Sequence, residues 1–180
     1  MTENDTPIIL AVDLDNTLIK TDMINVGLKF LLLYKIYLFP KLLWTFLYKG
    51  KTHAKKYLYH KSRFSIENIV FNEAVINFIR TNKKKYSSTI LISGSYHKYV
   101  DIFANHIGLF DYSVGTTIDI NMVGLNKVKY LNDFFDNSKF DYIGDSKKDI
   151  PIWEKARNAY VVNKNNISNS IKHINHTVIS

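Results

Sequence analysis

The chain of 180 residues is long enough for one domain, or for one domain with a sizeable insertion. Its hydrophobic content of 46% and aromatic content of 14% are enough for a buried core and exclude a disordered chain. The sequence has no cysteine, so disulfides and thiolate metal sites are excluded, which fits a reducing compartment. The polar, acidic start "MTENDTP" is unlike a secretory signal, and we therefore expect a cytoplasmic location.

The net charge of +8 is concentrated in one segment. From Lys20 to Arg63 the chain has ten lysines and arginines against one acid, Asp22, so the remaining 136 residues sum to −1. Basic proteins often bind nucleic acid, but these lysines are interleaved with apolar stretches such as "FLLLY" and "LLWTFLY", which suits anionic lipid headgroups. We expect no nucleic-acid partner, and residues 28–61 are a candidate for peripheral membrane contact.

The segment 28–48 is too polar for a simple membrane span. A span needs about 20 apolar residues, whereas this segment contains three lysines and Pro40. Two alternatives remain open: an ordinary helical cap that packs over a site, or a cap that also touches membrane lipid.

The chain begins with a predicted strand at 7–13, an apolar run that ends in polar residues. Helical patterns follow at about 22–38, 40–49 and 51–61, with breaks at Pro40 and Gly50, and an amphipathic helix is predicted at 71–84. Further strands are predicted at 88–93, 111–118, 140–145 and 159–163, and helices at 96–110, 126–136 and 149–158. The last 17 residues are weakly patterned.

Strands that alternate with helices predict an α/β fold, a doubly wound parallel sheet covered on both faces. The helical block after the first strand interrupts this alternation and is best explained as an inserted cap. We therefore expect an α/β core of residues 1–20 and 69–180, and a small helical cap of residues 21–68.

Three predicted strands end in residues that can carry chemistry: Asp13 and Asp15, Ser93 with Gly94, and Asp145. The carboxyl ends of parallel strands meet at one edge of the sheet, where ligands bind. Lys127 begins the helix after the third strand and can reach the same edge. A turn-forming role is the alternative for the two acids after the first strand.

These residue types suit phosphoryl transfer. Converging carboxylates repel one another without a cation, and oxygen ligands without His or Cys favour Mg²⁺ over zinc. Ser93, the amides of Gly94 and Ser95, and Lys127 are donors for phosphoryl oxygens. One Asp could attack phosphorus to give an aspartyl-phosphate, and a second Asp two residues later is placed for general acid and base catalysis.

The segments "DLDNT", "LISGS", Lys127 and "GDSKKD" resemble, in order and spacing, the four motifs of the haloacid dehalogenase (HAD) superfamily. The resemblance extends over about residues 7–163. It implies a HAD-like Rossmann-type core in which Asp13 is the nucleophile and Asp15 the general acid and base.

The same resemblance implies that Ser93 and Lys127 clamp the phosphate, and that Asp13, the Asp15 backbone carbonyl and Asp145 bind Mg²⁺. Asp149 would orient Lys127 or a metal-bound water. Family members that cleave carbon–halogen or carbon–phosphorus bonds lack the second Asp, so Asp15 favours a phosphomonoesterase.

A narrower resemblance concerns "DLDNTLIKTDM", the basic apolar hairpin, "FNEAVINFI" and "FDYIGDSKKDIPIWEKARNAYVVN". These segments are similar to the soluble domain fused ahead of UbiA-type membrane prenyltransferases. The 180 residues end where the membrane part would begin, so two alternatives remain: coupling to a transferase in trans, or no coupling.

The expected substrate is a lipid-linked or isoprenoid phosphate, because the cap combines lysines with aromatic residues. The alternatives are a small soluble phosphometabolite, such as a phosphoserine-like compound or a sugar phosphate, and a non-catalytic module that docks on a membrane partner. Asp15 argues against the last alternative, because a binding module needs no acid/base residue.

Overall fold

The centre of the protein is a six-stranded parallel sheet. The structure is a computed structural model that describes residues 7–162 and 169–180. The strands are β1 (Ile8–Val12), β2 (Ser88–Tyr96), β3 (Tyr112–Thr116), β4 (Lys139–Gly144), β5 (Asn158–Val162) and β6 (His176–Ile179). They lie in the order β3-β2-β1-β4-β5-β6, with every neighbouring pair parallel. The predicted α/β class is confirmed.

The direction of winding reverses beside β1. The chain moves outward from β1 through β2 to β3, and then returns to place β4 on the other side of β1. Val12, the last residue of β1, lies level with Leu91 of β2 and Ile143 of β4. Ligands of doubly wound sheets bind at such a reversal, outside the carboxyl ends of the strands.

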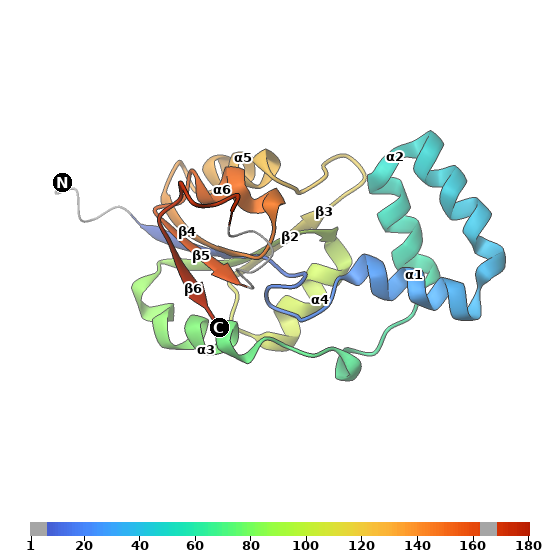
Figure 1. Cartoon of the computed structure of the whole chain (residues 1–180), viewed down its shortest axis with the longest axis horizontal. Helices are drawn as coiled ribbons and strands as arrows, with labels where there is room; N and C mark the ends of the chain where they lie inside the picture. Colours follow the sequence, from blue (N-terminus) through green and yellow to red (C-terminus); the bar gives the residue numbers. More distant parts are fainter. Residues whose placement is uncertain (1–6, 163–168) are drawn as a thin grey trace.

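Helices cover both faces of the sheet (Figure 1). One face packs against α3 (Glu73–Asn82) and α4 (His97–Ile107), and the other against α5 (Leu125–Phe134) and α6 (Ile150–Trp153). The alternation of side chains along β1 explains this: Leu10 and Val12 belong to the first core, and Ile9 and Ala11 to the second. Short 3₁₀ turns are η2 (Ile66–Asn68), η3 (Lys83–Lys85) and η4 (Lys147–Asp149).

Between β1 and β2 the chain leaves the sheet and forms a helical hairpin beside it (Figure 1). This hairpin consists of α1 (Met23–Tyr34), η1 (Ile36–Leu38) and α2 (Phe39–Lys61). Asp22 caps α1 by accepting from the amides of Ile24 and Asn25 at 2.8 and 3.1 Å. The hairpin has a small core of its own, made by Leu31, Leu42, Ala54 and Leu58.

Gly50 divides α2 into two helical segments that run in different directions. Its φ of 85° and ψ of 178° are not helical, and a side chain would strain this conformation. In the described part of the chain no single helix is long and apolar enough to cross a membrane. The pair of α1 with η1–α2 reaches the necessary length and composition, but its two parts are bent by 116°.

Several predicted boundaries were wrong. The first helix ends at Tyr34 rather than at residue 38, because Lys35 adopts a φ of −144°. The second helix begins at Phe39, with Pro40 in its first turn where the missing amide is harmless, so the predicted start near Pro40 is confirmed. The second strand continues past Ser93 to residue 96, with a register shift before its end.

The C-terminal strand β6 is absent from the sequence prediction. It pairs with β5 alone, and its residues His176 and Thr177 are polar, so the apolar run typical of a buried strand is missing.

The helix predicted at 149–158 is shorter in the structure, since α6 is four residues long. Asn163, the predicted last residue of the fifth strand, and residues 164–168 of the weakly patterned end lie outside the described residues.

Asp141, a fully buried residue of β4, is a testable anchor of the fold. Its carboxylate accepts from Arg157 Nε and Nη2 at 2.8 and 2.7 Å and from the Tyr86 hydroxyl at 2.8 Å. We expect Asp141→Ala to lower the free energy of unfolding by about 2–3 kcal/mol, because the tyrosine hydroxyl and the amide of Asn158 lose their acceptor. Urea titration measures the change. The exposed Asp133→Ala is the matched control, and equal stability of the two variants would contradict the anchoring role.

Candidate active site

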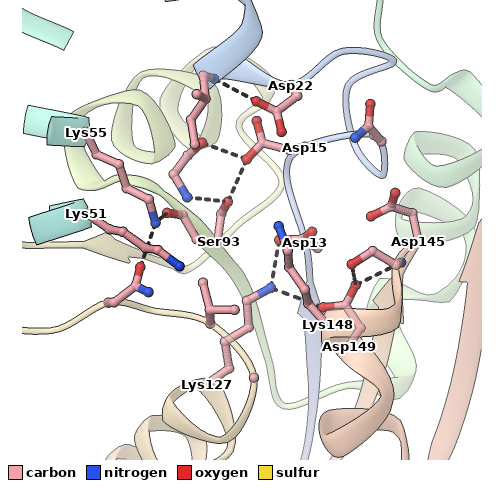
Figure 2. A pocket seen from close by; sticks show the side chains of 18 of the residues that line it. Asp13, Asp15, Asp22, Lys51, Lys55, Ser93, Lys127, Asp145, Lys148 and Asp149 are labelled. Carbon is pink, nitrogen blue, oxygen red and sulfur yellow. Dashed lines mark hydrogen bonds and ion pairs between the residues drawn. The ribbon is translucent and has the colours of Figure 1, made fainter. Parts of the chain in front are cut away.

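A cavity of about 360 Å³ lies at the carboxyl ends of β1, β2 and β4, with the hairpin on one side of it (Figure 2). Its lining includes every residue for which the sequence predicted a site role: Asp13, Asp15, Ser93, Gly94, Lys127, Asp145 and Asp149. They come from four separate parts of the chain. The sheet therefore brings the predicted residues together in one place, at the reversal of winding.

Asp13 follows β1 directly and is held by the sheet. Its amide donates to the Ile143 carbonyl at 2.9 Å, and its Oδ1 accepts from Lys127 Nζ at 2.8 Å. Only 8% of the residue is exposed. Burial raises the pKa of the Asp13 carboxyl to about 8, although the Lys127 ammonium acts in the opposite direction. Lys127 alone therefore does not keep this carboxyl ionised at neutral pH, and a further cation beside it would favour the charged form.

Lys127, on α5, sits in a buried network of three partners. Its Nζ donates to Asp13, to the Tyr142 hydroxyl at 2.6 Å and to Asp149 Oδ1 at 3.5 Å. Tyr142 in turn donates to Asp149 Oδ1 at 2.7 Å. Burial alone would lower the pKa of Lys127, but the carboxylates of Asp13 and Asp149 outweigh it and raise that pKa above its usual value. Lys127 therefore stays an ammonium.

Tyr142 was not predicted as a site residue. It lies within the apolar run of β4, and nothing in the local pattern distinguishes it from a core aromatic. Burial raises the pKa of its hydroxyl well above the usual value, so this group remains a neutral donor. Its place between Lys127 and Asp149 depends on the packing of α5 against the sheet.

Asp15 faces the same cavity from the turn after β1. Its Oδ1 accepts from the Met23 amide at 2.8 Å, and its Oδ2 accepts from the hydroxyls of Ser93 and Ser95 at 3.1 and 2.6 Å. Burial, and then Asp22, raise the pKa of its carboxyl, while these hydrogen bonds act against the rise. The sequence indicated only the Ser95 amide, as a phosphate donor, and not this contact of the Ser95 hydroxyl with Asp15. A carboxyl group with a raised pKa in a fixed orientation is suited to hold and release a proton.

The turn that carries Asp15 has left-handed backbone at its next residue. Asn16 has a φ of 55°, a conformation that asparagine tolerates better than most residues. The amides of Leu18 and Ile19 both donate to the Leu14 carbonyl at 3.0 Å, which closes the turn. This local structure directs the two acids of "DLD" into one cavity.

Three carboxylates on the other side of the cavity could hold a metal ion. Asp13, Asp145 and Asp149 each offer an oxygen, and these oxygens lie within 4.8 Å of one another. Burial and the nearby Asp149 raise the pKa of Asp145 to about 7. Three mutually repelling carboxylates without His or Cys fit a hard divalent cation such as Mg²⁺.

Asp149 also has a structural role. Its Oδ2 accepts from the amide and the hydroxyl of Ser146 at 3.1 and 3.0 Å, which forms a capping box at the start of η4. Its Oδ1 faces Lys127 and Tyr142. The geometry therefore places Asp149 among the possible metal ligands, whereas the sequence assigned it to orienting other groups.

The hairpin reaches into the cavity through Lys55. Its Nζ donates to the Gly94 carbonyl and to Asn121 Oδ1, both at 2.6 Å, and burial lowers its pKa to about 8. Thr52, one turn earlier, donates to the Ile118 carbonyl at 2.9 Å. Figure 2 shows Lys51 and Lys55 entering from α2, on the side away from Asp145 and Asp149. The sequence indicated only a basic segment, because these contacts join residues far apart in the chain.

Comparison with solved structures shows which proteins share this fold. A Bordetella pertussis protein of unknown function has a similar structure, with a TM-score of 0.73 at 13% identity over 98% of this chain and 99% of that chain. A phosphoserine phosphatase solved as an analogue of its phospho-aspartyl intermediate has a TM-score of 0.64 at 15% identity, over 98% of this chain and 95% of that chain. The chain has the fold of the HAD phosphatases.

Sequence comparison is less informative. No family model matches the sequence. The uncharacterized protein y4nM of Sinorhizobium fredii (strain NBRC 101917 / NGR234) is 28% identical over 156 residues. The match covers 85% of this chain but spans 29% of the length of that relative.

The raised carboxyl pKa values predict how metal and pH act together on stability. Asp13 titrates at 3.8 in its ordinary state and at about 8 in the fold, so between these values unfolding releases a proton and stability falls as the pH rises. Mg²⁺ binds ionised carboxylates and opposes this loss. We expect Mg²⁺ to raise the Tm more at a pH of about 8 than at about 5.5, as measured by differential scanning fluorimetry.

Asp145→Asn is the control for this effect, because it removes one carboxylate of the candidate metal site. The gain in Tm from Mg²⁺ should shrink in that variant. An equal gain at both pH values, or the same gain in the variant, would contradict the assignment of these carboxylates to a metal.

Proposed function

We propose that the protein is a Mg²⁺-dependent phosphomonoesterase that works through an aspartyl-phosphate on Asp13. The observation that carries the proposal is the pair of acids in one cavity: Asp13 beside Lys127, and Asp15 held by two serine hydroxyls. The shared fold with HAD phosphatases supports it. Asp15 also supports phosphate ester hydrolysis over cleavage of carbon–halogen or carbon–phosphorus bonds, because the HAD members that cleave those bonds lack the second acid.

In the first half-reaction, an oxygen of Asp13 attacks the phosphorus of the substrate and the bond from phosphorus to the ester oxygen breaks. Asp15 gives its proton to that oxygen, and the alcohol leaves. Ser93, the Gly94 amide and the Lys127 ammonium hold the phosphoryl oxygens. The raised pKa of Asp15 supports its role as the proton donor.

In the second half-reaction, the ionised Asp15 takes a proton from water, and the resulting oxygen nucleophile attacks the phosphorus of the Asp13 phosphate. The bond between Asp13 and phosphorus breaks, which returns the carboxylate and releases inorganic phosphate. Asp15 is then protonated again. One residue thus serves as acid and then as base.

The residues that would hold Mg²⁺ are Asp13 and Asp145, with Asp149 and the Asp15 backbone carbonyl as further oxygen donors. When bound, the ion would neutralise negative charge on the phosphoryl group. Tyr142 and Asp149 keep Lys127 directed at Asp13. In this proposal the chain's own contribution is to hold nucleophile, ammonium and acid in fixed positions within a buried cavity.

We propose that residues 21–68 form the cap that selects the substrate, over a core made by the rest of the chain. The cavity wall made by the cap combines apolar Ile24, Phe46 and Ala54 with Lys51 and Lys55. An apolar wall with two ammonium groups supports a lipid-linked or isoprenoid phosphate. Contact of residues 28–61 with a membrane surface would present such substrates, and the cysteine-free sequence fits a cytoplasmic location.

Two other candidates have support of their own. Solved structures with this fold include phosphoserine phosphatases, which favours a small soluble phosphometabolite. The resemblance to domains fused to UbiA-type prenyltransferases favours work beside such a transferase. The match to a relative of much greater length fits a domain that also occurs within a larger protein.

A substrate panel separates these candidates. Prenyl monophosphates, phosphatidic acid, phosphoserine and sugar phosphates would be compared by kcat/KM at one Mg²⁺ concentration. Preference for the prenyl compounds supports the lipid-phosphate proposal, and preference for phosphoserine or a sugar phosphate replaces it. Absence of turnover on all of them, and on p-nitrophenyl phosphate, supports a non-catalytic module.

Asp13→Asn tests the covalent mechanism. We expect Mg²⁺-dependent hydrolysis of p-nitrophenyl phosphate by the wild type, no hydrolysis in excess EDTA, and a loss of at least a hundredfold in kcat in the variant, because the amide is a poor nucleophile. Circular dichroism checks that the variant is folded. Retention of more than about a tenth of kcat, a loss below ~1.4 kcal/mol, would rule out Asp13 as the nucleophile.

Asp15→Asn tests the acid and base role. We expect both half-reactions to slow by about 10²–10⁴-fold, with the larger effect on formation of the phosphoenzyme from alkyl phosphates, whose leaving groups need a proton. Rapid-quench single-turnover experiments measure each step. Asp133→Asn, an exposed residue outside the cavity, is the control. Single-turnover rates equal to those of the wild type would remove the assigned role.

A further inference from the structure

The outer face of the hairpin is the most apolar part of the described surface. Within residues 7–162 and 169–180, ten of the eighteen exposed large hydrophobic side chains lie between residues 32 and 48. These ten define the outer face: Leu32, Leu33, Tyr34, Ile36, Tyr37, Leu43, Trp44, Phe46, Leu47 and Tyr48. Large exposed apolar patches mark sites that bind a partner or a membrane.

The position of these residues excludes a role in the protein's own core. The first half of α2 lies on the far side of the hairpin from the sheet (Figure 1). Its inward positions, Leu42 and Thr45, are already buried against the hairpin, whereas Leu43 and Leu47 are 52% and 65% exposed. At the turn between the helices, Leu33 and Tyr37 are 75% and 72% exposed. The outer face therefore lacks a covering element among the described residues.

The charge around the outer face selects the occupant. From residue 23 to residue 66 the chain has no Asp or Glu, and Lys29, Lys35, Lys41 and Lys49 lie among the apolar side chains. The Nζ of Lys49 lies 5.5 Å from the centre of the Trp44 ring, and that of Lys35 lies 5.5 Å from the Phe30 ring. These cation–π contacts place the two ammonium groups directly beside apolar rings, and the flexible lysine stems allow such groups to stay at a polar boundary.

We propose that the outer face docks on an anionic lipid bilayer, with its apolar side chains among the acyl chains and its lysines at the phosphate level. A second copy of the chain fits less well, because a symmetric contact would bring like charges together without an acid to pair them. An anionic bilayer matches both the apolar side chains and the lysines of the hairpin, since its acyl chains are apolar and lie beneath negatively charged headgroups.

Docking would also bring the cavity close to the headgroups. Phe46 belongs both to the outer face and to the cavity lining, and Lys51 lines the cavity just beyond Gly50. The consequence for the substrate rests on the proposed phosphatase function: a phosphate carried by a membrane lipid could enter without leaving the bilayer. The docking itself does not depend on catalysis.

Co-sedimentation with vesicles tests the docking. We expect the wild type to bind phosphatidylcholine vesicles that contain about a third phosphatidylglycerol, and to bind pure phosphatidylcholine at least tenfold more weakly. Binding should fall as NaCl rises from about 50 to 500 mM, because the ionic contribution is screened.

Two variants separate the apolar and the charged contributions. The apolar variant changes four side chains of the outer face together to Gln: Leu33, Tyr37, Leu43 and Leu47. The charge variant changes four lysines together to Gln: Lys29, Lys35, Lys41 and Lys49. Each variant should bind at least tenfold more weakly than the wild type. Two matched controls make the same kinds of change outside the outer face and should bind as the wild type does. The apolar control changes four exposed side chains to Gln: Val70, Ile102, Ile120 and Leu125. The charge control changes four lysines to Gln: Lys84, Lys85, Lys139 and Lys155.

Trp44 reports insertion directly. The only other tryptophan, Trp153, is buried, so a Trp153→Phe variant leaves one reporter on the outer face. Its emission should shift to shorter wavelength with anionic vesicles and be quenched by brominated acyl chains.

Three outcomes would overturn the docking proposal. The wild type could fail to bind anionic vesicles at low salt, or the control variants could lose binding as much as the outer-face variants. The third outcome is a concentration-dependent dimer of the wild type that the apolar variant, with Leu33, Tyr37, Leu43 and Leu47 changed to Gln, no longer forms. Hydrolysis of p-nitrophenyl phosphate without vesicles is measured in every variant. A variant that loses binding but keeps this activity separates a failure of docking from a failure of the proposed function.

Discussion

The buried ion pair between Asp13 and Lys127 is the interaction on which the site depends. Both residues are at most 8% exposed, and burying two charges costs several kcal/mol for each ion unless further hydrogen bonds compensate. Tyr142 and Asp149 supply that compensation around Lys127, and the Ile143 carbonyl fixes the Asp13 backbone. The reversal of the sheet winding beside β1 is what lets groups from β1, β4 and α5 meet. The fold thus holds a charge arrangement that its own residues only partly neutralise, which suits a site for a cation and an anionic group.

The helical hairpin is linked to the same arrangement, because it is inserted between β1, which leads into Asp13 and Asp15, and β2, which carries Ser93 to Ser95 of the cavity wall. Asp15 accepts from the first amide of α1, so the start of the hairpin is tied to the acid itself. Lys55 ties its far end to the Gly94 carbonyl on β2. A shift of the hairpin would therefore change the surroundings of Asp15 and Gly94 together. This linkage gives the hairpin a direct influence on the site without contributing a nucleophile.

Sequence patterns were sufficient for the parts of the structure that local chemistry determines. The strand that runs into "DLD" and the strand that runs into "GD" were predictable because an apolar run followed by acids is a local signal. The roles of Tyr142, of the Ser95 hydroxyl and of Lys55 were not predictable, since each depends on partners distant in the chain. The end of the first helix was predicted wrongly for a related reason. The backbone angles of Lys35 are not helical, although Lys35 is neither a proline nor a glycine. The edge strand β6 was missed because half of its side chains are polar.

The hairpin presents opposite chemistry on its two sides, and one short sequence accounts for both. Helical periodicity sends Leu42, Thr45 and Ala54 inward, Lys51 and Lys55 toward the cavity, and Leu43 and Leu47 outward. Gly50 makes this possible, because the change of direction at its left-handed φ lets the segment before it face away from the sheet while the segment after it returns to the cavity. An unbroken helix of this length would carry its second half away from β2 and lose the contact between Lys55 and Gly94. The bend at Gly50 therefore allows one helical hairpin to carry both the exposed apolar side chains and the lysines that line the cavity.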